Sequence, residues 1–288
     1  MTSDSPCSTA ILQVRELDKI YRISRLSRGE KREIHAVKKV SFDVGAGETL
    51  AIVGESGSGK SSVANSVLQL DPPTSGSVRF LGQELTGLSS RDLKAVRRNM
   101  QVIFQDPYAS LDSRIRIGEI VAEPLRIHFP RMKSAERLRK VEELFDLVGL
   151  GAMGLDRYPH QLSGGQRQRI GIARALILEP QLLVCDEAVS ALDVSIQAQV
   201  LNLLSDLQTK LQLAYLFITH DLGVVRQIAD RIAVMYQGEI LEYGLASQIL
   251  DHPQNSYTRA LINAVPGRGN EARETARQSL RERDADLQ

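Results

Sequence analysis

The sequence has few cysteines. Cys7 and Cys185 are the only two in 288 residues, and neither belongs to a C-x-x-C pair. We therefore expect neither a disulfide framework nor a cysteine-based metal site. Cys185 lies in an apolar run, and we interpret it as a small buried hydrophobe.

An excess of either charge is also missing, because Lys and Arg number 36 and Asp and Glu number 35. Proteins that bind nucleic acids usually carry a clear basic excess that meets the phosphates, so we expect no nucleic-acid partner. No stretch approaches the roughly 18–20 apolar residues that span a bilayer. Residues 1–10 are polar and lack the apolar region of a signal peptide. Any membrane role is therefore expected to come through a partner.

Apolar segments typical of strands alternate with helical patterns along most of the chain, which predicts an α/β protein with a mainly parallel sheet. Residues 107–162 have few β-branched runs and predict a mainly helical insertion, whereas residues 22–33 predict a solvated polar loop. The charged residues from 268 onward are expected to be exposed and partly disordered. Strands are expected at 12–17, 36–44, 49–53, 77–81, 101–104, 181–185, 214–218 and 231–235, and helices at 135–148 and 196–211.

Residues 54–61 (GESGSGKS) match the phosphate-binding pattern G-x-x-x-x-G-K-S/T, between a predicted strand and a predicted helix. Glycines allow a tight turn whose N–H groups face phosphate oxygens, and the helix N-terminus adds positive partial charge. Lys60 is expected to contact the β- and γ-phosphates, and the Ser61 hydroxyl to bind Mg²⁺. The alternative is a purely structural glycine turn.

Two further patterns are weaker by themselves. Asp186 and Glu187 end an apolar strand, where ligands of open α/β sheets bind, although an acidic pair on the surface is common there. Ser163 is a natural N-cap, and Gly164 and Gly165 leave the N–H groups of a second helix N-terminus uncovered. A capped structural helix explains this second turn equally well.

Together, these motifs resemble the ordered set of an ABC ATPase over roughly residues 11–265. By this resemblance Gln105 is the Q-loop glutamine, Asp186 belongs to Walker B, Glu187 is the catalytic glutamate and His220 is the switch histidine. The alternative for His220 is a structural histidine. The resemblance thus implies Glu187, His220 and Gln105 as catalytic residues, and Ser61, Gln105 and Asp186 as residues that bind Mg²⁺ through ATP. It implies a nucleotide-binding set of Tyr21, Gly54, Glu55, Ser56, Gly57, Ser58, Gly59, Lys60, Ser61, Ser62, Ser163, Gly164, Gly165, Gln166 and, from the D-loop, Asp193.

Tyr21 corresponds to the aromatic residue that stacks on adenine, but residues 22–33 place it further upstream than is usual. The alternative is a packed aromatic at a strand end. The fold implied by the resemblance is a P-loop NTPase core with an N-terminal antiparallel β subdomain and a helical subdomain at about 107–172. The ATPase domain is expected at 11–252, after a polar extension at 1–10 and before a C-terminal extension at 253–288.

Residues 104–111, 158–163, 186–197 and 256–261 are similar to the oligopeptide, dipeptide and nickel importer branch of this family. That branch normally pairs two different ATPases, one of which often carries C-terminal cysteines for an iron–sulfur centre. Because no cysteine follows Cys185, the chain resembles the partner without that centre. Ala188 stands where many members have proline, but this branch often has alanine there.

The resemblance implies an ATPase that powers uptake of peptides, or of nickel or metal chelates. Its expected partners are a second, related ATPase subunit in a head-to-tail dimer, two transmembrane permeases and an extracytoplasmic binding protein. The expected location is the cytoplasmic face of the membrane. The alternatives are a non-transport ABC ATPase and a nucleotide-binding regulatory module without hydrolysis. Tyr108 and Leu111 are expected to contact the permease, unless they merely pack the insertion onto the core.

Overall fold

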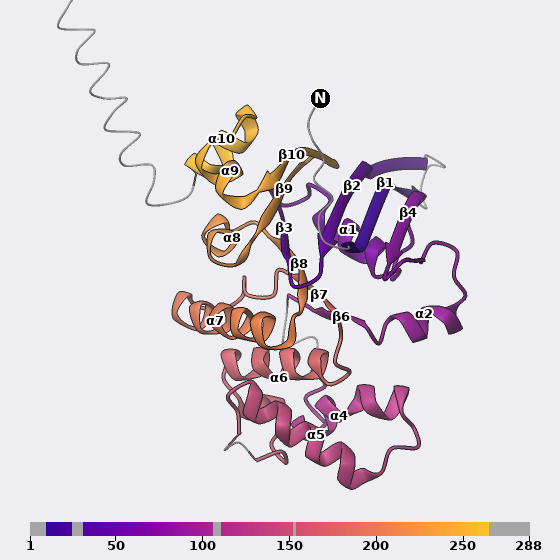
Figure 1. Ribbon diagram of the computed structural model, residues 1–288, viewed down its shortest axis with the longest axis vertical. Coiled ribbons are helices and arrows are strands. Elements are labelled where there is room, and N and C mark those ends of the chain that lie inside the picture. The colour runs from indigo at the N-terminus through magenta and orange to yellow at the C-terminus, as the bar shows by residue number, and fades with distance from the viewer. Residues whose placement is uncertain (1–9, 25–30, 106–110, 152–153, 265–288) are drawn as a thin grey trace, which may run out of the picture.

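The computed structural model describes residues 10–24, 31–105, 111–151 and 154–264. Within them, a parallel-sheet core lies between an antiparallel sheet and a group of helices (Figure 1). The strands are β1 (Ala10–Ser24), β2 (Lys31–Gly45), β3 (Thr49–Val53), β4 (Ser75–Phe80), β5 (Gln83–Glu84), β6 (Met100–Ile103), β7 (Leu182–Asp186), β8 (Ala214–Thr219), β9 (Arg231–Tyr236) and β10 (Glu239–Leu245). The helices are α1 (Lys60–Val67), α2 (Ser90–Val96), α4 (Ile117–His128), α5 (Ser134–Leu147), the 3₁₀ helix η1 (Pro159–Gln161), α6 (Gly164–Leu176), α7 (Val194–Leu211), α8 (Leu222–Ile228), α9 (Ala246–Asp251) and α10 (Ser256–Asn263).

The six-stranded sheet runs in the order β10-β9-β3-β8-β7-β6, and its strands are parallel except for β10. Strands β3 and β8 are buried along their whole length, which explains their unbroken apolar sequences TLAIV and AYLFIT. The prediction of an α/β fold with a mainly parallel sheet is confirmed.

The second sheet is antiparallel, in the order β2-β1-β4-β5, and packs on α1. Its inward residues alternate along most of β1 and β2, as expected for a sheet with one buried face, and register shifts interrupt the alternation between Val14 and Leu17. They join Val63 and Val67 of α1 in one apolar cluster, which includes Leu12, Val14, Leu17, Val37, Val40, Phe42 and Val44.

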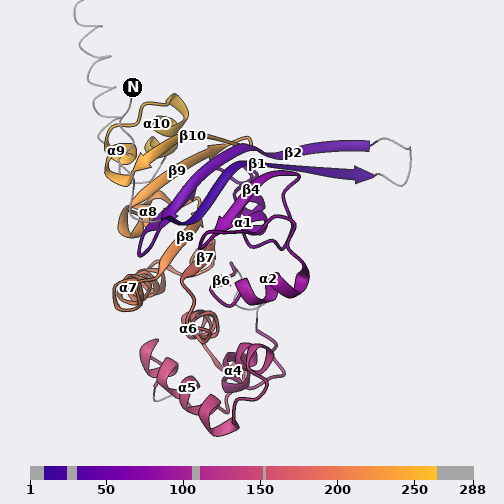
Figure 2. The same ribbon diagram turned by 45° about the vertical axis from the view of Figure 1, so that its right-hand side comes forward.

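The expectation of a solvated loop at residues 22–33 is wrong at both of its ends. Strand β1 continues to Ser24 and β2 begins at Lys31, so that a long hairpin arm projects beyond the sheet (Figure 2). Arg22 and Glu33 are partners across the two strands, with 3.0 Å between Arg22 Nε and Glu33 Oε1. Opposite charges on directly facing residues stabilise such pairing, and a pattern-based reading of a polar segment misses this contribution.

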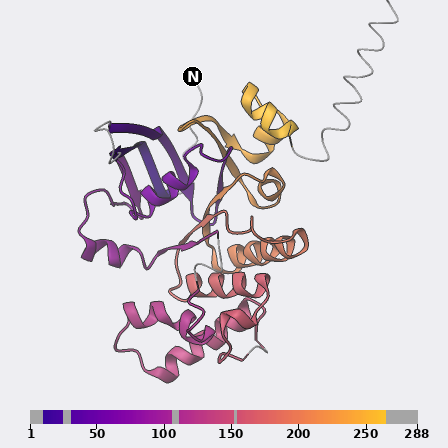
Figure 3. The same ribbon diagram turned by 180° about the vertical axis from the view of Figure 1, so that it is seen from behind.

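Helices α4, α5 and α6 form a layer at one end of the molecule, at the opposite end from α9 and α10 (Figures 1 and 3). Their shared core contains Ile117, Val121, Leu125, Phe145 and Ile170, all at most 1% exposed. Helix α6 contacts α7 and also strand β6, and the contact with β6 joins this layer to the parallel sheet. No helix in the described ranges is long and apolar enough to cross a lipid bilayer.

Leu111 does not lie on the surface where the permease contact was expected. It is 4% exposed and belongs to the core cluster shared with Ile117 and Ile103. The packing alternative therefore holds for Leu111. Tyr108, the charged tail from 268 and most of the N-terminal extension lie outside the described residues.

Leu111→Ala should lower the free energy of unfolding by about 2–5 kcal/mol, because it leaves a cavity in this core. Urea denaturation followed by circular dichroism measures the change. Leu138→Ala is the matched control, since Leu138 lies in the same helical layer but is 50% exposed. Equal stability of the two variants would contradict the burial of Leu111.

Candidate functional site

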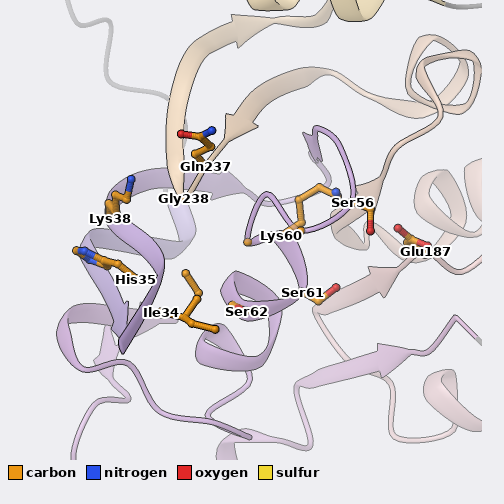
Figure 4. A pocket seen from close by; sticks show the side chains of 13 residues that line it. Ile34, His35, Lys38, Ser56, Lys60, Ser61, Ser62, Glu187, Gln237 and Gly238 are labelled. Carbon is orange, nitrogen blue, oxygen red and sulfur yellow. The ribbon is translucent and has the colours of Figure 1, made fainter. Parts of the chain in front are cut away.

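The loop between β3 and α1 forms one wall of a pocket of about 410 Å³. Lys60, Ser61 and Ser62 line it from the start of α1. Glu187 lies beyond them, at the opposite end from Ile34, His35 and Lys38 (Figure 4). The remaining described lining comes from β2 and from the turn between β9 and β10, namely Ile34, His35, Ala36, Lys38, Gln237 and Gly238, beside Ser56, Gly57 and Gly59 of the loop.

Glycine is required at two points of this loop because the backbone of other strands comes very close. A Cβ atom on Gly54 would lie 2.1 Å from the Met235 carbonyl oxygen. One on Gly59, whose φ is +105°, would lie 2.2 Å from the carbonyl oxygen of Ala36. The loop is thus wedged between β2 and β9, which fixes the direction of its N–H groups.

The Lys60 ammonium lies inside the turn of the loop, and the residue as a whole is 5% exposed. Its Nζ donates to the carbonyl oxygens of Gly54 at 2.8 Å and Glu55 at 2.7 Å. Burial lowers the pKa of Lys60, an effect opposed by the nearby carboxylates of Glu187 and Asp186. An anion in the pocket would compensate for this desolvation.

Ser61 and Asp186 come together from α1 and the end of β7. The Ser61 hydroxyl donates to Asp186 Oδ1 at 3.1 Å. Burial raises the pKa of Asp186, although the Ser61 hydrogen bond partly offsets this. A hydroxyl and a carboxylate oxygen beside a phosphate site fit the oxygen ligands that Mg²⁺ prefers. Within the described residues, no group of three or more His, Cys, Asp or Glu lies close enough together to hold a metal ion.

The other two residues predicted to be catalytic, Gln105 and His220, both contact Glu187. Its Oε2 accepts from Gln105 Nε2 at 2.7 Å, and its Oε1 lies 3.2 Å from His220 Nδ1. The Glu187 backbone has a φ of +48°, an uncommon conformation for a residue other than glycine. Its N–H donates to the Ile218 carbonyl of β8, which holds this conformation in place.

Tyr21 lies next to the pocket but is not part of its described lining. Its hydroxyl donates to Ser62 Oγ at 3.3 Å, and Lys19 Nζ lies 5.1 Å from the centre of its ring. Ile34, which pairs with Tyr21 across the hairpin, lines the pocket instead. Sequence reasoning missed the β2 and β9–β10 lining, since nothing in these segments marks them as neighbours of residues 54–61.

The second glycine turn, residues 163–166, does not line the pocket described above, which we call the Lys60 pocket. Ser163 and Gln166 form a capping box at the start of α6. A Cβ atom on Gly165 would lie 2.6 Å from Ile196 Cγ2, so this turn packs against the start of α7. Asp193 caps α7 by accepting from the Ile196 N–H at 2.9 Å.

Comparisons with known proteins agree with this geometry. The ABC transporter family profile matches residues 37–190. The di/tripeptide transport ATP-binding protein DppF of Pseudomonas aeruginosa is 49% identical over 257 residues, which are 89% of this chain and 79% of DppF. The glutathione import ATP-binding protein GsiA of Escherichia coli K12 is 51% identical over 259 residues, and the match spans 89% of this chain but 41% of GsiA.

Solved structures give the same result. A dimeric ATP-binding cassette in a post-hydrolysis state, bound to ADP and Pi, superposes with a TM-score of 0.72 and 30% identity over 82% of this chain and 98% of that one. The cbiO1 protein of Clostridium perfringens, part of an ABC transporter complex, superposes with a TM-score of 0.74 and 26% identity over 92% and 99% of the two chains.

Proposed function

The chain belongs to the ABC transporter family, in the branch of peptide importer ATP-binding subunits, and on that premise we propose that it binds ATP with Mg²⁺ in the Lys60 pocket and hydrolyses it to ADP and phosphate. The observation that carries this proposal is the convergence of five residues at the carboxyl ends of the parallel strands, namely Lys60, Ser61, Asp186, Glu187 and His220. They supply a buried cation, an oxygen pair for a metal and a carboxylate beside a histidine.

Each residue has a role in this reaction. Lys60 and the loop N–H groups bind the phosphates, and Ser61 with Asp186 would hold Mg²⁺, which neutralises charge on the phosphates. Glu187 orients a water molecule and accepts its proton. Gln105 and His220 keep the Glu187 carboxylate in place, and His220 also faces the γ-phosphate. Tyr21 stacks on adenine at the pocket rim.

The energy of hydrolysis drives uptake of short peptides through a membrane permease. The names of the DppF and GsiA relatives support peptides above nickel or metal chelates. The subunit works at the cytoplasmic face of the membrane, attached to two permease subunits that receive substrate from an extracytoplasmic binding protein. Tyr108 contributes to the permease contact in this proposal, whereas Leu111 lies in the core and does not.

ATP joins two subunits head to tail in this proposal. The Ser163–Gln166 turn is the second half of a nucleotide site, but it does not line the Lys60 pocket of its own chain. In a facing subunit, Gly164, Gly165 and Asp193 would close over the γ-phosphate. The partner ATPase is a related but different chain. Closure favours one state of the permease over the other.

Lys60→Ala should weaken ATP–Mg binding by about 10- to 100-fold, because hydrogen bonds to a charged group contribute about 1.5–3 kcal/mol. Isothermal titration calorimetry measures the affinity. Lys140→Ala is the control, because Lys140 pairs with Glu179 on the surface. Near wild-type affinity of Lys60→Ala would remove residues 54–61 from the nucleotide site.

Glu187→Gln should retain ATP binding but lower turnover by roughly 10²- to 10⁴-fold, because an amide cannot accept the proton of the attacking water. It should also accumulate a closed dimer with bound ATP. Phosphate release and size-exclusion chromatography measure the two effects. Glu179→Gln is the matched control, and turnover of Glu187→Gln within about tenfold of wild type would exclude Glu187 as the base.

Gly164→Asp should impair hydrolysis on the facing subunit while its own Lys60 pocket still binds ATP. A carboxylate at the start of α6 repels the γ-phosphate. Paired with the wild-type partner ATPase, Gly164→Asp should lose hydrolysis at the partner's nucleotide, whereas Lys60→Ala should lose it at this chain's own pocket. Loss of ATP binding to its own pocket in Gly164→Asp, or full hydrolysis at the partner's nucleotide in that variant, would contradict the head-to-tail arrangement.

A further inference from the structure

A tyrosine of the C-terminal helix α10 contacts the phosphate-binding loop from outside the pocket. The backbone N–H of Glu55 donates to Tyr257 Oη at 3.3 Å, across 202 positions of the sequence. Tyr257 itself is not part of the described lining of the pocket. It therefore touches the loop without standing where the phosphates would bind.

Several contacts fix Tyr257 in this position. Its ring packs on Tyr236, the last residue of β9, with 4.4 Å between the ring centres. Its N–H donates to the side chain of Asn255, which caps α10, at 2.8 Å. The preceding Gln254 N–H donates to Glu242 Oε1 of β10 at 2.6 Å. Thr258 and Ile262 bury the inner face of α10.

Glu55 is consequently held on both sides of its backbone. Tyr257 accepts from its N–H, and Lys60 Nζ donates to its carbonyl oxygen at 2.7 Å. Further along the loop, the Gly238 N–H donates to the carbonyl oxygen of Ser58 at 2.9 Å. Gly238 lies two residues after Tyr236, so the ring pair and this bond brace the loop from the same end of β9.

The Lys60 bonds are the ones that bound phosphate competes for, because Lys60 is the cation of the pocket. Tyr257 is not part of the described lining of the pocket, so a phosphate bound there would not compete for its bond to Glu55. Partial burial raises the pKa of Tyr257, so its hydroxyl stays neutral and accepts from the amide. The start of the loop at Glu55 is therefore fixed by a hydrogen bond that does not depend on a bound ligand.

We propose that Tyr257 is a positioning residue of the nucleotide site, whose hydroxyl orients the Glu55 peptide and so prepares residues 54–61 for phosphates. The inference rests on the proposed ATP binding at Lys60. A loop held in its binding conformation loses less conformational freedom when the ligand binds. The C-terminal extension therefore acts on nucleotide affinity through one hydrogen bond.

Tyr257→Phe tests this role, because it removes the hydroxyl and keeps the ring on Tyr236. We expect the dissociation constants of ATP–Mg and ADP–Mg, and the KM for ATP, to rise roughly two- to tenfold, the factor of one neutral hydrogen bond. The kcat at saturating ATP should stay within about twofold of wild type, since the lost bond acts on binding alone. Hydrogen–deuterium exchange should accelerate in peptides that contain Glu55.

Tyr243→Phe is the matched control, because Tyr243 Oη also accepts from a backbone N–H, that of Asp43 at 3.2 Å, but away from the pocket. Unchanged nucleotide affinity in Tyr257→Phe, or an equal loss in both variants, would overturn the proposal. So would faster exchange spread through α10 and β9 rather than confined to the loop. Wild-type protein that fails to bind ATP would instead refute the proposed function.

Discussion

The carboxyl ends of four parallel strands meet at one edge of the sheet, and the groups proposed to act on ATP leave the sheet there. The phosphate loop follows β3, Gln105 follows β6, Asp186 ends β7, and His220 follows β8. Parallel pairing is what gathers them, because neighbouring parallel strands end on the same side. The buried residues of β3 and β8 therefore determine the site as much as its polar residues do.

Much of this arrangement was predictable from the sequence, since each of the four groups directly follows an apolar run that reads as a strand. Strand β3 was expected at its observed bounds. The strand pairing of residues 22–24 with 31–33 was not predicted, because cross-strand pairs such as Arg22 with Glu33 depend on register rather than on local hydrophobicity. Ile34 and Gly238 were missed for a similar reason, because they reach the pocket through tertiary contacts.

Contacts between residues far apart in the sequence were the hardest feature to predict. Leu111 resembles an exposed residue of a polar segment, yet it is buried because α4 and α6 supply an apolar environment. Tyr257 belongs to a segment that resembles a family extension, and nothing in its sequence indicates a bond to Glu55. Such contacts are decided by how helices pack on the sheet, which periodicity does not specify.

The electrostatics of the site favour a ligand that carries charges of both signs. Burial lowers the pKa of Lys60 and raises the pKa of Asp186. It therefore disfavours the charged form of each group, which is the form that binds a ligand of opposite charge. Phosphates beside Lys60 favour its ammonium form, and a divalent cation beside Ser61 and Asp186 favours the carboxylate. A nucleotide without the cation would satisfy Lys60 but would bring negative charge toward Asp186 and Glu187. The proposed function therefore favours the metal complex of the nucleotide, because that complex would compensate the charges of Lys60 and Asp186 at once.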